Sequence, residues 1–296
     1  TLGRMAHELG YVMPDKKTVY LSDDGTNVGL FMFIADKEED LSAGVLYAAK
    51  WNQTDDKNGG SADLEWISLG HATNAEIEKA INDGIKFADM FETAEFKDDT
   101  CPAGFTPTKA NADSNQKTPA ECIKLKDGME RVASRLESRR VAAIKGATVE
   151  FRKMEGITYN NNLNEVYIGM SEINKGMESF KNKGKDSDKY DVKGQDHIRL
   201  EHNTCGVVYR LALAKDDKIG SDYVPTTMKG LVAGKYSTTG DKLNTCDLDG
   251  LANPDNVTYI NNTGVLIIGE DTGDGHQNDA IWAYNIAEDK LTRIFT

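Results

Sequence analysis

The sequence predicts a mainly β fold, a β-propeller with a helical insertion, because a strand-turn-strand unit recurs three times along the chain. Each unit begins with a short segment that carries a carboxylate, at Glu8, Glu155 and Asp255, and an apolar strand starts 11, 11 and 10 residues later. An acidic residue and a further apolar strand follow in every copy. Repeated units of this kind are typical of propeller blades.

The elements of each unit can be placed along the chain. The second strands are expected at 19–21, 166–168 and 265–267, and the third strands at 30–33, 207–211 and 280–284. The acids between them are Asp23 and Asp24, Glu172, and Glu270 and Asp271. Two further strands, at 45–51 and 64–69, are separated by a polar Gly-Gly turn and would complete the first blade as a four-stranded unit.

Residues 73–147 predict an insertion of helices and loop between the first two units. Ile77, Ile81 and Ile85 recur every four residues behind Thr73 and Asn74, which favours an amphipathic helix over 73–91. A second helix is predicted over 129–145. Its basic face is interpreted as solvated, with a phosphate or partner site as the alternative; it consists of Arg131, Arg135, Arg139 and Arg140.

The chain is expected to form a single propeller domain over 1–296, or a large fragment of one. With 296 residues and 39% hydrophobic content, it can bury a sizeable core. Three units are fewer than the four to eight blades that usually close a propeller. We therefore expect flanking chain, a partner or unrecognised strands to complete it. Residues 174–198, rich in Lys, Asp and Gly, predict a surface excursion.

Charge and hydropathy exclude two classes of partner. A net charge of -13 argues against nucleic acid, because binding a phosphate backbone requires a basic surface. The apolar stretches have the length of strands and fall short of the roughly 20 residues of a membrane-spanning helix. An acidic surface is compatible with calcium.

The four cysteines form two local couples, Cys101 with Cys122 and Cys205 with Cys246, and none has the CxxC spacing of zinc or redox sites. Two disulfides are predicted, with four free thiols as the alternative. Disulfides would place the protein in the periplasm or outside the cell. No leader pattern precedes the first unit, so we expect a processed or excised piece.

The acids that open the three units are candidate metal ligands. If the blades surround an axis, the inner strands begin at one channel, and Glu8, Glu155 and Asp255 should converge there. Ionised carboxylates cannot share a small volume unless a cation neutralises them. Calcium or a trivalent metal such as iron would suit oxygen ligands. The alternative is that these acids only start strands and face solvent.

Three other features carry weaker hypotheses. His7 and His276 are candidates for a catalytic role, although a histidine beside a strand is more often structural. The loop 271–279 is rich in Asp, Asn and Gly and either wraps a second calcium ion or forms a polar turn; it lacks the EF-hand spacing.

Several motifs together resemble the PhoX family of alkaline phosphatases. They are the run from Gly3 to Glu8, the turn at Asp23 and Asp24, the segment 151–156, and the segment 253–256. The resemblance implies a secreted or periplasmic propeller that hydrolyses phosphate esters with iron and calcium ions.

The same resemblance implies roles for individual residues. The family's metal ligands fall on Glu8, Glu155, Asp255 and Asn256, and its phosphate-contacting arginine falls on Lys153, with Arg152 beside it. Lysine keeps the charge but loses the bidentate geometry of arginine. The family's iron-binding cysteine lies upstream of the first motif, before the start of this chain, and no cysteine here inherits that role.

The sequence thus predicts metal-dependent hydrolysis of a phosphate monoester. Two alternatives stay open. One is a metal-dependent lactonase of the gluconolactonase type, with a single axial ion. The other is a calcium-stabilised, non-catalytic propeller fragment or interaction module.

Overall fold

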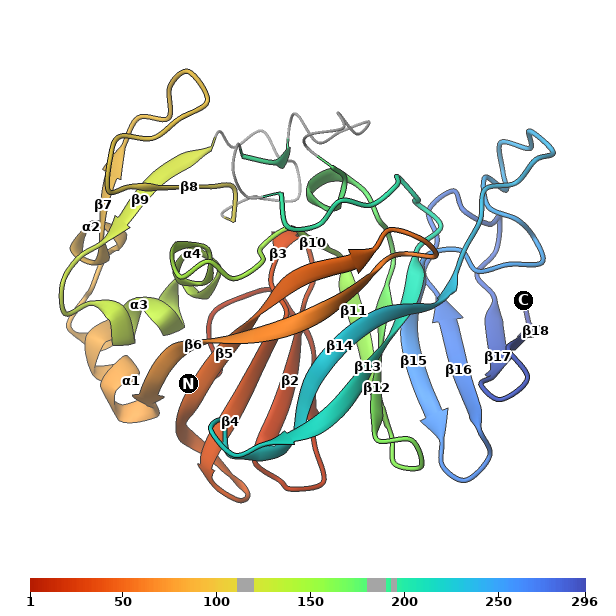
Figure 1. Cartoon of the computed structure of the whole chain (residues 1–296), viewed down its shortest axis with the longest axis horizontal. Helices are drawn as coiled ribbons and strands as arrows, with labels where there is room; N and C mark the ends of the chain where they lie inside the picture. Colours follow the sequence, from red (N-terminus) through yellow and green to blue (C-terminus); the bar gives the residue numbers. More distant parts are fainter. Residues whose placement is uncertain (111–119, 180–189, 193–195) are drawn as a thin grey trace.

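The computed structural model describes residues 1–110, 120–179, 190–192 and 196–296, and it contains three four-stranded antiparallel blades (Figure 1). The first blade consists of β1 (His7–Val12), β2 (Thr18–Asp23), β4 (Phe31–Lys37) and β5 (Asp40–Asp55). The second consists of β11 (Met154–Asn160), β12 (Glu165–Met170), β13 (Val207–Asp216) and β14 (Ser221–Ala233). The third consists of β15 (Pro254–Ile260), β16 (Val265–Glu270), β17 (Ile281–Asn285) and β18 (Lys290–Phe295). The predicted mainly β, blade-type fold is confirmed.

The strand β6 (Ser61–Thr73) joins the first two blades at their outer edges. The expectation that 64–69 would complete a four-stranded blade is wrong, because β1, β2, β4 and β5 already form that blade. The long hairpin of β5 and β6 instead reaches across to β14, and Asp63 pairs with Thr227 there (Figure 1). The result is a nine-stranded sheet whose end strands, β1 and β11, lie against each other.

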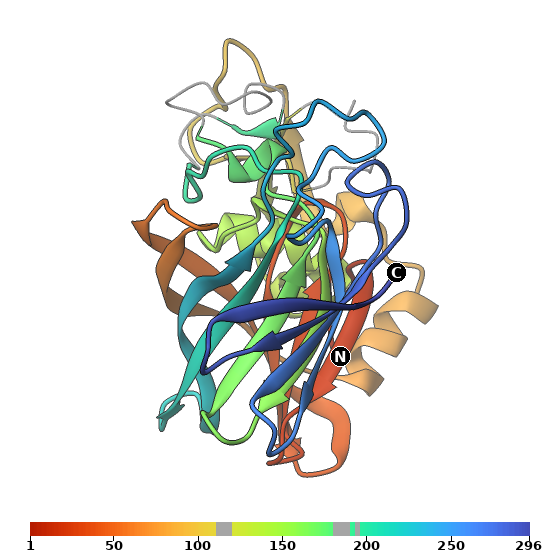
Figure 2. The same ribbon diagram turned by 90° about the vertical axis from the view of Figure 1, so that its right-hand side faces the viewer.

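The main core fills the space enclosed by this nine-stranded sheet. Trp51 on β5 packs edge-on against Phe151 and Tyr209, with ring centroids 6.1 Å apart in each pair. All three rings are fully buried. A second apolar cluster lies between the second and third blades and includes Tyr167, Val208 and Trp282. Figure 2 shows the third blade from its outer side, facing the viewer.

Two glycines allow the third blade to pack tightly on the second. A Cβ at Gly169 on β12 would collide with the carbonyl oxygen of Asp255, and one at Gly156 would lie 2.9 Å from the same oxygen. Because neither residue has a side chain, β15 lies directly over β11 and β12. This close approach fixes the position of Asp255.

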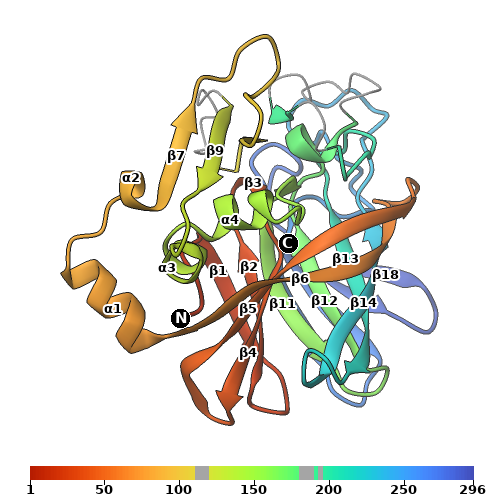
Figure 3. The same cartoon turned by 60° about the vertical axis from the view of Figure 1, so that its left-hand side comes forward.

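The insertion between the blades is more regular than the sequence predicts. The helix α1 (Asn74–Asn82) is capped by Thr73, one of the two residues expected to cap it, and Glu76 completes a capping box; the helix ends before Ile85. The helix predicted over 129–145 is two helices, α3 (Glu130–Leu136) and α4 (Ser138–Ile144), because Glu137 leaves the helical conformation with φ -139° and ψ 53°. A short helix α2 (Phe87–Met90) precedes a small unpredicted sheet, formed by β7 (Phe91–Ala94), β9 (Glu121–Leu125) and β8 (Thr106–Thr108) (Figure 3). Residues 111–119 of the insertion lie outside the described residues.

The interpretation of the arginine-rich helix face as solvated holds for the exposed Arg131 but is wrong for Arg135, Arg139 and Arg140. Arg135 is 2% exposed and donates hydrogen bonds to the carbonyl oxygens of Gly44 and Gly70, so it ties α3 to β5 and β6. The other three arginines form ion pairs with carboxylates. These pairs are Arg131 with Glu76, Arg139 with Asp23, and Arg140 with both Glu121 and Glu137.

The expectation of a surface excursion over 174–198 is wrong for most of the part that the structure describes. Residues 180–189 and 193–195 lie outside the described residues. The preceding turn η1 (Lys175–Met177) has Gly176 and Met177 buried, and Asp191, Val192 and Ile198 are also buried. This segment is packed against β3 (Thr26–Val28) and β10 (Phe151–Arg152), which pair with each other.

Both predicted disulfides are present, Cys101 with Cys122 and Cys205 with Cys246. The first joins the segment after β7 to β9 within the insertion. The second joins the start of β13 to the loop before β15. In the part of the chain that the structure describes, no helix has the length and apolar character needed to span a membrane.

Candidate metal centre

The three blades repeat one local geometry where each inner strand begins. Residue pairs His7 and Asp23, Met154 and Met170, and Pro254 and Glu270 open the ladders between the first two strands, and each ladder then shifts register. Such bulges re-aim the side chain within them. The shifts place the following side chains in equivalent positions: Glu8, Glu155 and Asp255.

A carboxylate cluster forms between the first and second blades. One oxygen from each of Glu8, Asp24 and Glu155 lies within 4.8 Å of the others. Glu155 is buried, Asp24 is half-buried and Glu8 is exposed, so the cluster opens to solvent on one side. The structure thus brings Glu8 and Glu155 together as the repeat predicts.

Asp24 is the cluster residue that the sequence analysis did not propose as a ligand. It follows β2, and its amide donates to the carbonyl oxygen of Ala6 at 2.9 Å. This bond folds the turn back over the start of β1 and directs Asp24 towards Glu8. The sequence shows two adjacent acids in this turn, Asp23 and Asp24. Only the pairing of β1 with β2 shows that Asp24 is the one that reaches the carboxylate cluster. Asp23 is buried and pairs with Arg139 instead.

Asp255 and Asn256 lie at the border of the cluster. The pKa of the half-buried Asp255 carboxyl is raised, first by burial and then by the negative charges of Asp271 and Glu8. The charge of the cluster therefore acts on Asp255. Its oxygens are not part of the 4.8 Å group. Asn256 is exposed, and its amide nitrogen donates to Asp255 Oδ1 at 2.6 Å.

Lys153 brings a positive charge to these acids. Its Nζ lies 3.2 Å from Glu155 Oε1. Burial opposes its charged form, but Glu155 and Asp24 together outweigh burial and raise the pKa of Lys153. The residue adopts φ 42°, which is uncommon for a side chain with a Cβ. Its amide donates to Gly25 at 2.8 Å and its carbonyl accepts from Ser171 at 3.1 Å, so both neighbours hold this conformation.

Arg152 has a different environment, although it is adjacent in sequence. Its guanidinium lies 2.8 Å from Glu172 and also donates to Thr26 Oγ1 at 2.9 Å and to Asn174 Oδ1 at 3.2 Å. These contacts connect β10, β3 and the turn after β12. Arg152 is thus held within the structure, whereas Lys153 faces the carboxylate cluster.

Ser171 supports Glu155 from the second strand of the same blade. Its hydroxyl donates to Glu155 Oε1 at 3.0 Å, and the residue is 1% exposed. The pKa of Glu155 is raised overall. Burial is the main cause and the charge of Asp24 adds to it, while the charge of Lys153 and the hydrogen bond from Ser171 act in the opposite direction. A raised pKa in a cluster of acids makes Glu155 a candidate functional residue.

The histidines and the loop 271–279 have structural partners. His7 contacts the carbonyl oxygen of Gly3 at 3.0 Å through Nε2. His276 is buried, with Nδ1 2.9 Å from Glu270 and Nε2 3.0 Å from the carbonyl oxygen of Asp247. In the loop, Asp279 accepts the amide of Thr272 at 2.8 Å. These contacts favour the polar-turn interpretation of 271–279.

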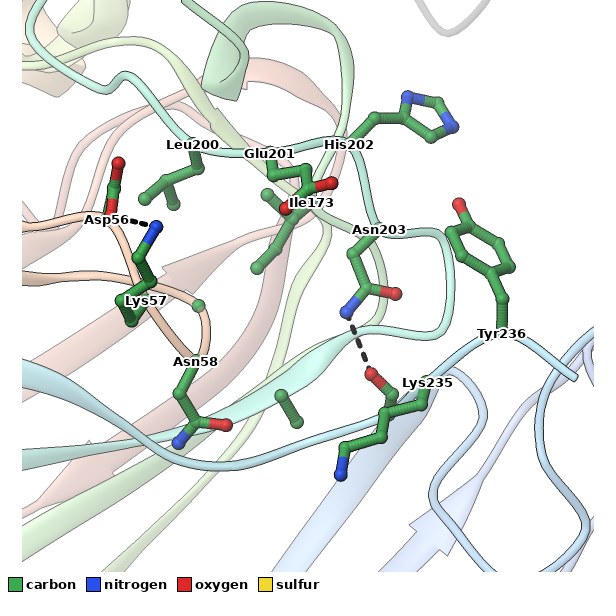
Figure 4. Close-up of a pocket in the computed structure, with 13 residues that line it drawn as sticks. Asp56, Lys57, Asn58, Ile173, Leu200, Glu201, His202, Asn203, Lys235 and Tyr236 are labelled. Carbon is green, nitrogen blue, oxygen red and sulfur yellow. Dashed lines mark hydrogen bonds and ion pairs between the residues drawn. The ribbon is translucent and has the colours of Figure 1, made fainter.

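Two adjoining cavities lie near the second blade, and their lining does not include Glu8, Asp24 or Glu155. One, of about 590 Å³, is lined by residues that include Glu172 and Asn253, which flank Ser171 and Pro254 in sequence. The other, of about 410 Å³, lies between the tip of the β5–β6 hairpin and the segments 200–203 and 233–236 (Figure 4). His202 and Tyr236 line both cavities, so the two form one open surface depression.

Comparison with known proteins places this geometry in a family. The model of the family alkaline phosphatase PhoX matches residues 1–292. The structure of Pseudomonas fluorescens PhoX in complex with vanadate, a transition state analogue, is similar with a TM-score of 0.57 and 17% identity. The match covers 99% of this chain and 44% of that one, so the chain spans less than half the length of that protein. A luciferin-regenerating enzyme matches with a TM-score of 0.27 and 12% identity, over 99% of this chain and 78% of that chain. No curated protein sequence matches the chain.

Proposed function

The chain belongs to the alkaline phosphatase PhoX family, and on that premise we propose that it hydrolyses phosphate monoesters with metal ions held between its blades. The observation that carries the proposal is the convergence of Glu8, Asp24 and Glu155. A vanadate complex of Pseudomonas PhoX supports phosphoryl chemistry for the relative, since its title describes vanadate as a transition state analogue.

The residues of the cluster fit a hard metal ion. Calcium binds oxygens at 2.3–2.6 Å, so two ligands of one ion lie at most about 5 Å apart. The oxygens of Glu8, Asp24 and Glu155 meet this limit. Asp255, with its raised pKa, and Asn256, with a carbonyl oxygen, would complete the ligand set at the border. We propose calcium and iron as the ions, since calcium takes carboxylate and carbonyl oxygens and the resemblance to the PhoX family implies iron beside it.

The bound ions would supply charge neutralisation at the phosphoryl oxygens and an activated oxygen nucleophile. Lys153 would bind a phosphoryl oxygen through Nζ, which lies beside Glu155 and remains protonated because of the surrounding acids. Arg152 would position the site, since its contacts with Glu172 and Thr26 fix β10 next to Lys153. Ser171 would orient Glu155.

We also propose that the protein works in the periplasm or outside the cell. The two disulfides support this location, because such bonds persist in oxidising compartments. The depression lined by His202 and Tyr236 would receive the organic part of the phosphoester.

The test compares the wild-type chain with Glu155→Gln. Metal content would be measured by elemental analysis, and hydrolysis with p-nitrophenyl phosphate. In the variant, metal affinity and activity should fall together by at least about tenfold. Loss of a group that only supports a metal ligand already costs about that much, and loss of a ligand should cost no less. Glu65→Gln is a matched control, because the Glu65 side chain is 59% exposed and pairs with Lys50 at 3.6 Å; metal content and activity should both be unchanged in this variant.

Three results would contradict the proposal. Glu155→Gln with full metal content and full activity would exclude the cluster as the site. Calcium binding by the wild type without phosphoester hydrolysis would favour a non-catalytic module. Hydrolysis of lactones in place of phosphoesters would favour the lactonase alternative.

A further inference from the structure

A second group of buried acidic side chains lies apart from the candidate metal centre, where the described residues 190–192 and 196–198 lie near β3, β10 and η1. Glu150, Glu178 and Asp191 are 5%, 1% and 6% exposed. Burial, then Glu150 and then Asp196, raises the pKa of Asp191 to about 10, although Lys109 acts in the opposite direction. The carboxyl of Asp191 is therefore in an environment that strongly disfavours an uncompensated negative charge.

The acids of this group differ in their hydrogen bonds. Glu150 Oε2 accepts from the amide of Ile198 at 2.8 Å, and Glu178 Oε1 accepts from His202 Nδ1 at 2.8 Å. Within the described residues, neither oxygen of Asp191 has a hydrogen-bond donor. Burial of a polar group without a partner costs several kcal/mol. Asp191 has no hydrogen-bond donor among the described residues, although the charge of Lys109 acts on it.

Asn27 provides an independent observation. It is 2% exposed, and its Nδ2 donates to the carbonyl oxygen of Tyr190 at 2.6 Å, which places its amide next to Asp191. No described residue donates to its Oδ1. A Cβ at Gly176 would collide with this Oδ1 and would lie 3.0 Å from the carbonyl oxygen of Glu150. The amide oxygen is therefore aimed into the space between η1 and Glu150.

We propose that Asn27 Oδ1 and the carboxylate of Asp191, together with an oxygen of Glu150 or Asp196, hold a divalent cation of the hard, oxygen-preferring class, such as calcium. The open positions here are all acceptors, namely both oxygens of Asp191 and one of Asn27. A proton on Asp191 would turn one of its oxygens into a donor and leave the other oxygen open, whereas a cation contacts several oxygens at once. An amide carbonyl with carboxylates is a common calcium ligand set.

The cation would connect two parts of the fold. Asn27 belongs to β3, next to Thr26, which accepts a hydrogen bond from Arg152 at 2.9 Å. Asp191 belongs to the short described segment 190–192. An ion between them would hold this segment against the sheet behind the candidate metal centre. The inference does not rest on the proposed function.

The test measures calcium binding to metal-stripped protein by equilibrium dialysis. Asp191→Asn should bind one equivalent of calcium fewer than the wild type, and calcium should raise its Tm less. Glu155→Gln should keep this equivalent. Asp249→Asn is the control, because that side chain is 95% exposed, and it should behave as the wild type. An unchanged stoichiometry and Tm response in Asp191→Asn would overturn the proposal.

A second variant covers the case in which Asp191→Asn does not fold. Asn27→Asp keeps the oxygen, adds a negative charge and tolerates the φ of 55° at this position. It should bind calcium at least about tenfold more tightly, since ligand charge sets the affinity of such sites, and it should be less stable than the wild type without metal. Equal calcium affinity in Asn27→Asp and the wild type would contradict the proposal.

Discussion

Ser171 occupies in the second blade the position that Asp24 occupies in the first. The amide of Ser171 donates to the carbonyl oxygen of Lys153 at 3.1 Å, and the amide of Asp24 donates to that of Ala6 at 2.9 Å. Each acceptor lies two residues before the acid that opens its blade, Glu155 or Glu8. Asp271 makes the same bond to Asn253 in the third blade, at 3.2 Å. One backbone geometry therefore supports three different side chains, and the second blade has a neutral donor where its neighbours have acids.

Replacement of Ser171 by Ala should weaken metal binding without disrupting the blade. The variant loses the 3.0 Å hydrogen bond to Glu155, so the carboxylate loses its orientation and its pKa rises further. We expect metal affinity to fall about tenfold, as is typical for groups that orient a ligand. A metal titration measures this. Ser22→Ala is the control, because Ser22 is equally buried but bonds to the amide of Leu9; equal losses of affinity in both variants would contradict the role of Ser171.

Substitutions should show that Lys153 binds phosphate and that Arg152 stabilises the fold. Lys153→Asn tolerates the positive φ and should raise KM and weaken inhibition by inorganic phosphate by about tenfold, with little change in stability. Arg152→Gln should instead lower the free energy of unfolding by about 1–3 kcal/mol, because its charged hydrogen bonds to the partly exposed Glu172 are lost. Steady-state kinetics and urea unfolding measure the two effects. A large stability loss in Lys153→Asn with unchanged phosphate binding would reverse the assignment.

The close packing of the third blade at Gly169 should determine the metal content of the candidate site. Gly169→Ala introduces a methyl group against the carbonyl oxygen of Asp255, and backbone must shift to accommodate it. We expect a loss of about 1–3 kcal/mol of stability, with reduced metal content because Asp255 moves. Gly250→Ala is the control, since the closest atom to its Cβ would be 3.6 Å away. Normal metal content in Gly169→Ala would show that Asp255 does not contribute to the centre.

The spacing of apolar strands predicted the blades because each blade repeats the same pattern of local pairing. That repeat also indicated Glu8 and Glu155, since both open an inner strand. It did not identify Asp24 as the third acid, because the turn contains two adjacent acids and only the tertiary contact of Asp23 with Arg139 distinguishes them. The burial of Arg135 and the pairing of β6 with β14 were missed for a related reason: both depend on contacts between segments far apart in sequence.

His276 should make the stability of the third blade depend on pH. The hydrogen bond to Glu270 is the main cause that raises the pKa of His276, against the opposing effect of burial, and the carbonyl oxygen of Asp247 adds to it. Both ring nitrogens face acceptors, so the doubly protonated ring donates from both and the neutral ring from only one. A folded pKa above the unfolded value of about 6.5 means that this stabilisation is complete below about pH 6.5.

The stabilisation should therefore be lost as the pH rises through the folded pKa of His276. His276→Asn does not titrate, so it should be less stable than the wild type by about 1–2 kcal/mol at pH 5.5, and the difference should narrow at alkaline pH. Urea unfolding of both proteins from pH 5.5 to 9 measures this difference and cancels the titration of groups that they share. A difference that is constant with pH would mean that His276 stabilises the loop by packing, because only a change in charge produces a slope.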